Sequence, residues 1–347
     1  MTTSRRLEIL EALVSTPTAP FHEYRMRDAI VELLSSRPEV RLEEDGFGNL
    51  VAIRGSGDGP PGWCFGAHMD HPGFVALPEE AGEKGFEDKP ERARGRYTFL
   101  GGVPDRYFAK NPPIREYGEF AMWDLPAFEV RDGTQVWSRA CDDLVGCAAI
   151  VALLHELDER GSEARVAGVF TRAEEVGFVG ANHFAKEWPF DPSTCFVSLE
   201  TSIAVGSAKP GGGAMCRVGD RMSIFDHHAT ANMISAAAKR EIPVQRALLD
   251  LGACEASALQ AHGIRTAGVS VPWGTYHNCA PDDTIQPEFV EIADIDSLGE
   301  LVLALVEDYP AGPQESGAAL RQRFEDRVAQ HTAFIEGTAG DFGSRFG

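Results

Sequence analysis

The sequence is poor in positive charge. It has 32 Lys and Arg against 53 Asp and Glu, which gives a net charge of −21 over 347 residues. A negative balance of this size argues against nucleic acids and anionic membrane surfaces as partners. An acidic surface instead suits cations and a soluble, cytoplasmic setting.

Long apolar runs are also missing. No stretch approaches the roughly 20 apolar residues of a membrane-spanning helix, and the first residues, 1–6, have no apolar signal core. The seven cysteines, an odd number without a CxxC pair, fit reduced thiols better than a disulfide framework. We therefore expect a cytoplasmic protein without a membrane anchor.

Two common catalytic motifs are absent as well. The glycines at 211–213 are not followed by the Lys-Ser/Thr pair of a phosphate-binding loop. No serine-centred nucleophile elbow occurs, so an acyl-enzyme mechanism has little support.

What the sequence does have is a pair of adjacent acids, Glu174 and Glu175, just after the apolar run 166–170. Two carboxylates at the end of a buried strand are costly unless they face water or hold a metal ion. Four other segments favour the metal, because each places a ligand-type residue at the end of an apolar stretch. These residues are His68, Asp142, Glu200 and His277.

Strand ends of this kind meet at one edge of an open α/β sheet. Imidazoles with carboxylates suit zinc, cobalt or manganese, and five such ligands with one bridging carboxylate can hold two ions about 3.5–4 Å apart. One glutamate of the pair would then bind metal, and the other would stay free as a base. Asp70, two residues after His68, is placed to accept a hydrogen bond from the second imidazole nitrogen.

The pattern along the chain predicts a layered α/β fold. We expect two helices at 5–14 and 23–34, then a hairpin of 41–44 and 50–54 that leads into the strand ending at His68. From 142 onward helices and strands alternate, as in a sheet flanked by helices. The predicted elements are helices 142–156, 180–186, 226–239, 255–260 and 288–306, and strands 166–171, 195–199 and 264–270.

Three parts follow from this pattern. Residues 73–135 are rich in glycine, proline and charge and show no helical period, so we expect an inserted small β-domain there. It interrupts a catalytic domain made of 1–72 and 136–308. After the Pro/Gly break at 310–313, the segment 309–347 is expected to be an appendage with a helix over 318–334.

The ordered motifs carry a family resemblance. Ala67-His68-Met69-Asp70, Ala140-Cys141-Asp142-Asp143, Ala173-Glu174-Glu175-Val176-Gly177, Ser198-Leu199-Glu200 and the run 272–277 resemble the TET-type dinuclear metallo-aminopeptidases. These enzymes are of the glutamyl aminopeptidase kind, and some carry the name endoglucanase. The similarity covers about residues 5–308, and it implies a zinc-exopeptidase-like fold with an inserted small β-barrel domain.

The resemblance also implies roles for single residues. One metal ion would be held by His68, Asp142 and Glu200, and a second by Asp142, Glu175 and His277. Glu174 would be the general base and Asp70 the partner of His68. The cofactors would be two divalent ions per subunit, Zn or Co, or alternatively Mn. A homo-oligomer, in the family a tetrahedral particle of twelve subunits, is implied in the same way.

Four positions depart from the family pattern. Glu200 stands where aspartate is common, His71 where an acid is common, and Glu255 lies in a glycine-containing segment that usually carries Thr-Asp. Gly274-Thr275-Tyr276 replaces an Arg-Tyr pair before the last ligand. His71, Glu255 and Tyr276 are therefore candidate substrate-binding residues, and the substrate preference stays open.

The leading prediction is an aminopeptidase that removes N-terminal residues from peptides through a metal-bridging hydroxide, with Glu174 as general base. The expected partner is therefore a peptide or small amide substrate. An alternative with the same chemistry is a metal-dependent deacylase of small acylated amino acids. An alternative of another class is an inactive assembly or binding protein that keeps the fold, against which the intact Glu174 argues.

Two acidic residues have a second interpretation. Asp142 could cap its helix instead of binding metal, unless Asp143 does so. Asp226, His227 and His228 look like a further metal motif, but they open a predicted helix that Asp226 can cap.

Overall fold

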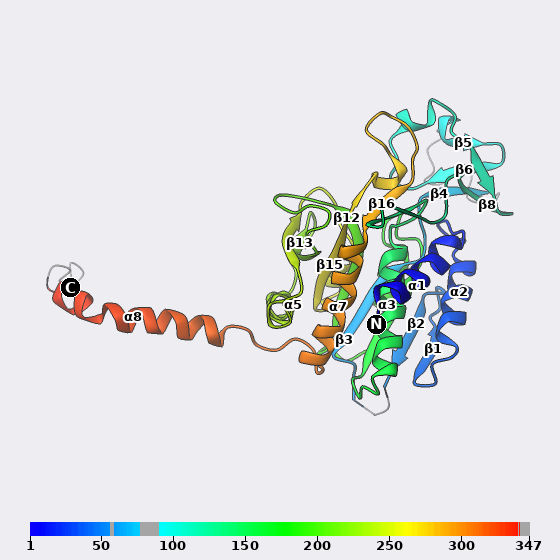
Figure 1. Cartoon of the computed structure of the whole chain (residues 1–347). Coiled ribbons are helices and arrows are strands. Elements are labelled where there is room, and N and C mark those ends of the chain that lie inside the picture. The colour runs from blue at the N-terminus through cyan, green and yellow to red at the C-terminus, as the bar shows by residue number, and fades with distance from the viewer. Residues whose placement is uncertain (56–58, 77–89, 339, 341–347) are drawn as a thin grey trace.

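The computed structural model describes residues 1–55, 59–76, 90–338 and 340. Figure 1 shows a body of helices packed on a large sheet, with a smaller sheet at one end and a single helix projecting away. This is the layered α/β fold that the sequence predicts. Residues 77–89 of the predicted insertion, and 339 and 341–347 of the predicted appendage, lie outside the described residues.

The large sheet has eleven strands among the described residues. Nine follow the order β1-β2-β11-β3-β12-β15-β16-β10-β9, and β13 and β14 continue it beside β15. The bounds are β1 Val40–Glu44, β2 Leu50–Arg54, β3 Trp63–His68, β9 Glu129–Arg131, β10 Gln135–Ser138, β11 Val166–Thr171, β12 Cys195–Ile203, β13 Ala214–Asp220, β14 Val244–Leu249, β15 Thr266–Gly274 and β16 Glu288–Glu291.

The centre of this sheet is parallel. β11 pairs with β3, β3 with β12, and β12 with β15, all in parallel register. β3 and β11 are buried at every position, as expected for strands that helices cover on both faces. The carboxyl ends of these strands therefore meet at one edge of the sheet.

Helices cover the two faces unequally. The most apolar helix, α3 (Leu144–Glu159), shares one core with α1 (Thr3–Ser15), α2 (Tyr24–Leu34), α5 (His227–Lys239) and α7 (Ile292–Asp308). On the other face, α4 (Val179–Lys186) and α6 (Glu255–Ala261) pack with β2, β3, β11 and β12. The central strands are thus shielded from water except at their ends.

The small sheet is antiparallel and curls as half of a barrel. Its order is β5-β6-β4-β8-β7. The bounds are β4 Gly73–Ala76, β5 Ala93–Arg94, β6 Tyr97–Leu100, β7 Ile114–Glu116 and β8 Phe120–Trp123. An aromatic core holds it together, in which Phe74 packs edge-on against Phe99 and Trp123 with ring centroids 4.9 and 4.8 Å apart.

Several boundaries differ from the sequence prediction. The last strand of the small sheet ends at Trp123, and β9, which we expected inside the insertion, pairs with β10 in the large sheet. The segment 288–306 is not one helix, because 288–291 forms β16 against β10 and β15 before α7 begins. The hairpin strand β2 pairs with β11, so β11 lies between it and β3.

β13 and β14 are among the strands that the sequence analysis does not predict. β13 and β14 form a parallel pair, and β13 also pairs antiparallel with residues 268–270 of β15. β14 alternates between buried and exposed residues without a strongly apolar run, which hides it from a search for buried strands. β13 contains Arg217, which lines a cavity at this end of the sheet.

The C-terminal helix α8, Ala318–Thr338, extends four residues beyond the predicted end at 334. Its described side chains are exposed, and it projects away from the body (Figure 1). None of the helices in the described ranges has both the length and the apolar character of a membrane span.

Candidate active site

The candidate site lies where the parallel strands end. His68 is the last residue of β3, and Glu174 and Glu175 follow β11 after a two-residue turn. His277 follows β15, and Asp142 precedes α3. Glu200 lies inside β12, three residues before its end, and not at the strand terminus that the sequence suggested.

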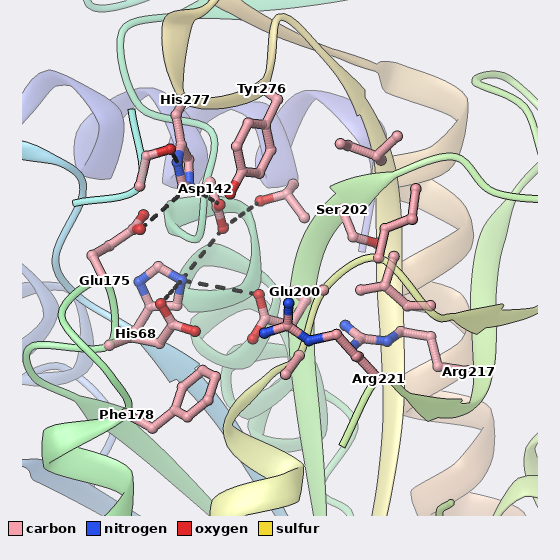
Figure 2. Close-up of a pocket in the computed structure, with 18 of the residues that line it drawn as sticks. His68, Asp142, Glu175, Phe178, Glu200, Ser202, Arg217, Arg221, Tyr276 and His277 are labelled. Carbon is pink, nitrogen blue, oxygen red and sulfur yellow. Dashed lines mark hydrogen bonds and ion pairs between the residues drawn. The ribbon is translucent and has the colours of Figure 1, made fainter. Parts of the chain in front are cut away.

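Asp142 stands between the two histidines. Its Oδ1 lies 3.3 Å from His68 Nε2, and its Oδ2 lies 3.5 Å from His277 Nε2 (Figure 2). Glu175 Oε2 is 3.3 Å from His277 Nε2. Glu174 and Glu200 each bring an oxygen within 3.9 Å of His68 Nε2. One carboxylate therefore faces both imidazoles, and each imidazole has further acids beside it.

These contacts define groups that could each hold a metal ion. The ligand atoms of His68, Asp142 and Glu200 lie within 4.8 Å of one another, and so do those of Asp142, Glu175 and His277. Glu174 belongs to neither group; it forms a third one with His68 and Glu175. The structure thus brings together all six residues that the motifs predicted.

The histidine tautomers fit a metal. His68 Nδ1 lies 3.0 Å from the carbonyl oxygen of Asp70, and His277 Nδ1 lies 3.4 Å from that of Gly102. A carbonyl can only accept, so each Nδ1 donates its proton and each Nε2 faces carboxylate oxygens. A proton on Nε2 or a metal ion between the two atoms would satisfy these contacts, and Glu175 Oε1 is buried without a hydrogen-bond partner.

The electrostatics of the site show the same need for positive charge. Burial raises the pKa of Glu174 and of Glu175 well above the usual range, and the neighbouring acids raise them further. Burial likewise raises the pKa of Glu200 to about 8. Burial alone would lower the pKa of His68, but Glu174, Asp142 and Asp70 outweigh it and raise that pKa well above normal. Divalent cations would relieve this excess of buried negative charge.

Asp70 has a different contact from the one that the sequence suggests. Its carboxylate is 3.6 Å from His68 Nδ1, and the closer partner of that nitrogen is the Asp70 carbonyl. The Asp70 carboxylate instead accepts the backbone N–H groups of Glu174 at 2.9 Å and Glu175 at 3.1 Å. Asp70 therefore fixes the turn that carries both glutamates.

Glu23 supports the same turn from α2's side, and the sequence analysis missed it. It is fully buried, and its two oxygens accept from Ala173 N at 3.0 Å and Arg172 Nε at 2.8 Å. Ala173 has a positive φ of 55°, so these hydrogen bonds hold a turn that is unfavourable for a non-glycine residue. No sequence motif marks Glu23, because its partners lie about 150 residues away.

A second buried set positions Asp142. Glu288 Oε2 accepts from Cys141 N at 2.6 Å and Asp142 N at 3.2 Å. His71 Nδ1 donates to the Asp142 carbonyl at 2.8 Å, and its Nε2 lies 3.2 Å from Asn278 Oδ1. Burial lowers the pKa of His71 to about 4. The sequence analysis placed Glu288 in a helix and did not single out Asn278.

The hydrogen bonds at the starts of α3 and α5 show which acidic residues cap these helices. Asp143, not Asp142, caps α3 by accepting from Gly146 N at 3.1 Å. Asp226 caps α5 by accepting from Ala229 N at 2.7 Å, and no cluster of metal-ligand type among the described residues includes His227 or His228. Asp142 is therefore left free to face the histidines.

A cavity of about 470 Å³ opens beside the six residues. Of the three candidate substrate-binding residues, only Tyr276 lines it, with its ring stacked 3.8 Å from that of His277. His71 and Glu255 are buried and do not line it, and Glu255 accepts a hydrogen bond from the hydroxyl of Thr171. The wall also contains residues that the sequence analysis missed, namely Phe178, Thr201, Ser202, Ile203, Arg217, Arg221, Leu249 and Leu251.

Comparison with known proteins finds chains of similar sequence and fold. A curated protein of Acetivibrio thermocellus, provisionally described as an aminopeptidase, is 25% identical over 335 residues, which cover 82% of this chain and 93% of that protein. The solved dodecamer of PhTET1 has a similar fold, with a TM-score of 0.69 and 22% identity over 86% of this chain and 98% of that one. The Pyrococcus horikoshii TET1 peptidase can assemble into a tetrahedron or a large octahedral shell. Its structure has a TM-score of 0.68 and 22% identity, and the match covers 86% of this chain and 98% of that one.

The fold and the cluster of histidines and acids at the sheet edge are those of a metal-dependent peptidase. The sequence profile of the M42 glutamyl aminopeptidases matches residues 114–297, which is more than half of the chain. The chain belongs to the M42 glutamyl aminopeptidase family and is a hydrolase of peptide bonds.

Proposed function

We propose that the chain is an aminopeptidase that works with two divalent metal ions. His68, Asp142 and Glu200 would hold one ion, and Asp142, Glu175 and His277 the other. The observation that carries the proposal is the shared carboxylate, since the two oxygens of Asp142 face the Nε2 atoms of different histidines at 3.3 and 3.5 Å. Zinc or cobalt, or alternatively manganese, suits two imidazoles with three carboxylates.

When bound, two such ions would polarise the scissile carbonyl and make a water molecule more acidic. Glu174 is the residue for proton transfer, because it lies beside both ligand groups without belonging to either. It would take a proton from the attacking water and pass it to the leaving amine. Burial raises the pKa of this carboxyl well above its ordinary value.

The acidic wall favours a substrate with a free amine. Asp142, Glu174, Glu175 and Glu200 all line the cavity, and Arg217 and Arg221 are the only lysine or arginine residues among the lining residues of the described chain. A peptide's N-terminal ammonium would be attracted to these carboxylates, whereas an acylated amine carries no charge to attract. This difference favours an aminopeptidase over a deacylase of acylated amino acids.

Matched substrates test the proposal. The metal-free chain would be reconstituted with zinc, cobalt or manganese and given a tripeptide, its N-acetylated twin and N-acetyl amino acids. We expect release of the N-terminal residue from the free tripeptide only, and loss of activity with a chelator. Hydrolysis of the N-acetyl amino acids alone would instead support the deacylase, and no hydrolysis of any substrate would support an inactive binding protein.

A homo-oligomer, with twelve subunits as the specific expectation, is part of the proposal. Its support is the fold shared with the PhTET1 dodecamer. Light scattering on the full chain tests it, because a particle of twelve 37.6 kDa chains differs clearly in mass from a monomer or dimer.

A further inference from the structure

The C-terminal helix α8 carries an uncovered apolar face. Leu320, Phe324, Val328 and Ile335 are each more than half exposed. Their spacing of four, four and seven residues keeps them on one face of the helix. We propose that this face pairs, in antiparallel orientation, with the same face of α8 in a second copy of the chain. The pairing is an interaction between copies and goes beyond the proposed catalytic function.

The helix has little to hold it in isolation. It has 21 residues and is about 30 Å long, and it projects from the body (Figure 1). Most of the stability of a helix in a protein comes from the packing of its apolar face, yet every described side chain of α8 is exposed. An apolar face along such a helix is explained if a partner buries it.

The start of α8 is fixed on the body. Gln314 N donates to Asn232 Oδ1 at 2.7 Å, and Ser316 N donates to His228 Nδ1 at 3.2 Å. Asn232 and His228 belong to α5, so the chain is held until two residues before α8 begins at Ala318. The helix is therefore presented from a defined point on the body and is not the end of a loose tail.

The charge distribution favours a second copy of the chain as the partner. The net charge of the chain is −21, so two bodies repel each other, yet α8 itself has three arginines and three acidic residues. Charges in water are screened over about 8 Å at physiological ionic strength, which is much less than the roughly 30 Å length of α8. Most of the helix thus lies outside the field of the acidic body, and two copies can meet there.

The charges beside the apolar face fit an antiparallel pair. With a two-fold axis between residues 328 and 329, Arg321 of one helix is level with Glu336 of the other, on the same flank. The symmetry makes this contact twice. In a parallel pair opposite flanks meet, and Arg321 would instead face Arg323 and Arg327 of the other helix. Charge therefore selects the antiparallel orientation.

The same register interleaves the apolar side chains. Ile335 of one helix falls between Leu320 and Phe324 of the other, and His331 falls between Phe324 and Val328. The two Val328 side chains meet next to the axis. Side chains that alternate in this way pack as knobs into holes, which is how paired helices bury an apolar seam. Shape and charge thus agree on one register.

Oxidative cross-linking of the full chain tests the pairing. In the proposed register Val328→Cys brings two thiols together, whereas Ala333→Cys, the matched control, places its thiol on the opposite face of α8. We expect most Val328→Cys chains to run as a linked species of two 37.6 kDa chains on a non-reducing denaturing gel. Ala333→Cys and the wild-type chain should show no such species above background, since six of the seven native cysteines are buried.

Charge reversal within the Val328→Cys chain tests the register. Arg321→Glu places two acids opposite each other at both ends of the pair, and Glu336→Arg places two arginines there. Each single reversal should raise the concentration for half linkage by roughly 2- to 30-fold, the range for the loss of two exposed ion pairs. The double reversal should restore it. The contact of Arg321 with Glu315 of its own chain, at 3.6 Å, cannot produce this rescue, because residue 336 takes no part in it.

Equal linkage of Val328→Cys and Ala333→Cys, or linkage of neither, would overturn the proposal. A double reversal that stays as weak as the single ones would overturn the antiparallel register. Phe324→Asp in the Val328→Cys chain should abolish linkage, because it places a charge in the seam, and undiminished linkage would contradict the pairing. The gel needs neither substrate nor metal and reads the link in a particle of any size, so its result is independent of the proposed function.

Discussion

The carboxylate of Asp70 accepts a hydrogen bond from the backbone N–H of Glu174 at 2.9 Å. Its other oxygen accepts from the N–H of Glu175 at 3.1 Å. Asp70 follows β3 and the two glutamates follow β11, so these bonds join the ends of two adjacent parallel strands. The side chain that sequence reasoning assigned to histidine orientation thus holds the glutamates in place, while its own carbonyl orients His68.

Asp70→Asn tests this arrangement. An amide nitrogen cannot accept, so one of the two N–H groups loses its partner, at a cost of about 1–3 kcal/mol. We expect a lower Tm and a loss of kcat, with the metal content largely kept. Asp70→Glu, which keeps the charge but changes the reach, should not restore kcat. Loss of metal with an unchanged Tm would mean that Asp70 acts mainly through His68.

The two proposed metal positions should be separable by mutation. His277→Ala removes the imidazole that faces Glu175 and Asp142 but leaves the group of His68, Asp142 and Glu200 intact. We expect the metal content to fall from about two ions per chain to about one, as measured by elemental analysis after reconstitution. His227→Ala, an exposed histidine outside every candidate group, is the control. An unchanged count for His277→Ala would contradict the assignment.

Stability without metal should depend on pH through Glu255. Burial raises the pKa of this side chain to about 7, above the 4.5 of an unfolded glutamate. A carboxyl with a raised folded pKa stabilises the fold below the unfolded pKa, and this contribution is lost as pH rises through the folded pKa. The contribution of Glu255 to the free energy of unfolding therefore falls by roughly 3 kcal/mol between pH 5 and 8.

The measurement is the Tm of the chelator-treated protein at several pH values. We expect the wild-type Tm to fall from pH 5 to 8, and the fall to be smaller for Glu255→Gln, which stays neutral and can still accept from Thr171. Equal slopes for both proteins would show that Glu255 does not titrate in this range.

The C-terminal helix should be dispensable for the catalytic fold. The described side chains of α8 are exposed along its whole length. A chain that ends after Ser316 is therefore expected to keep its Tm and its kcat per subunit, as measured by calorimetry and by peptide hydrolysis. A fall in Tm of several degrees would mean that α8 packs against the catalytic body of its own chain or of another.

The sequence predicts the site well because the ligands sit at strand ends next to apolar runs. The strand 166–171 is found with both of its bounds, and the five residues predicted as metal ligands lie close together with Glu174 beside them. Such signals are local, since a buried strand is an unbroken apolar run and a charged residue after it stands out.

The features that the sequence does not show depend on contacts between residues that are far apart in the chain. Glu23 and Glu288 support the site through hydrogen bonds to backbone groups about 150 residues away, and no local pattern encodes such pairs. β16 looks helical because its four residues continue into α7, and pairing with β10 and β15 overrides that tendency. The sequence also did not mark Arg217 as a cavity residue, because β13 was not recognised as a strand.

The central claim is that Glu174 is the base while other side chains hold the metal, and one sample of Glu174→Gln tests it most directly. Metal content and turnover of a free tripeptide are measured on the same preparation, with Glu187→Gln, an exposed glutamate after α4, as control. We predict two ions per chain and a loss of about 10²- to 10⁴-fold in kcat. Full turnover with both ions bound would contradict the assignment of Glu174, and loss of an ion would make it a ligand.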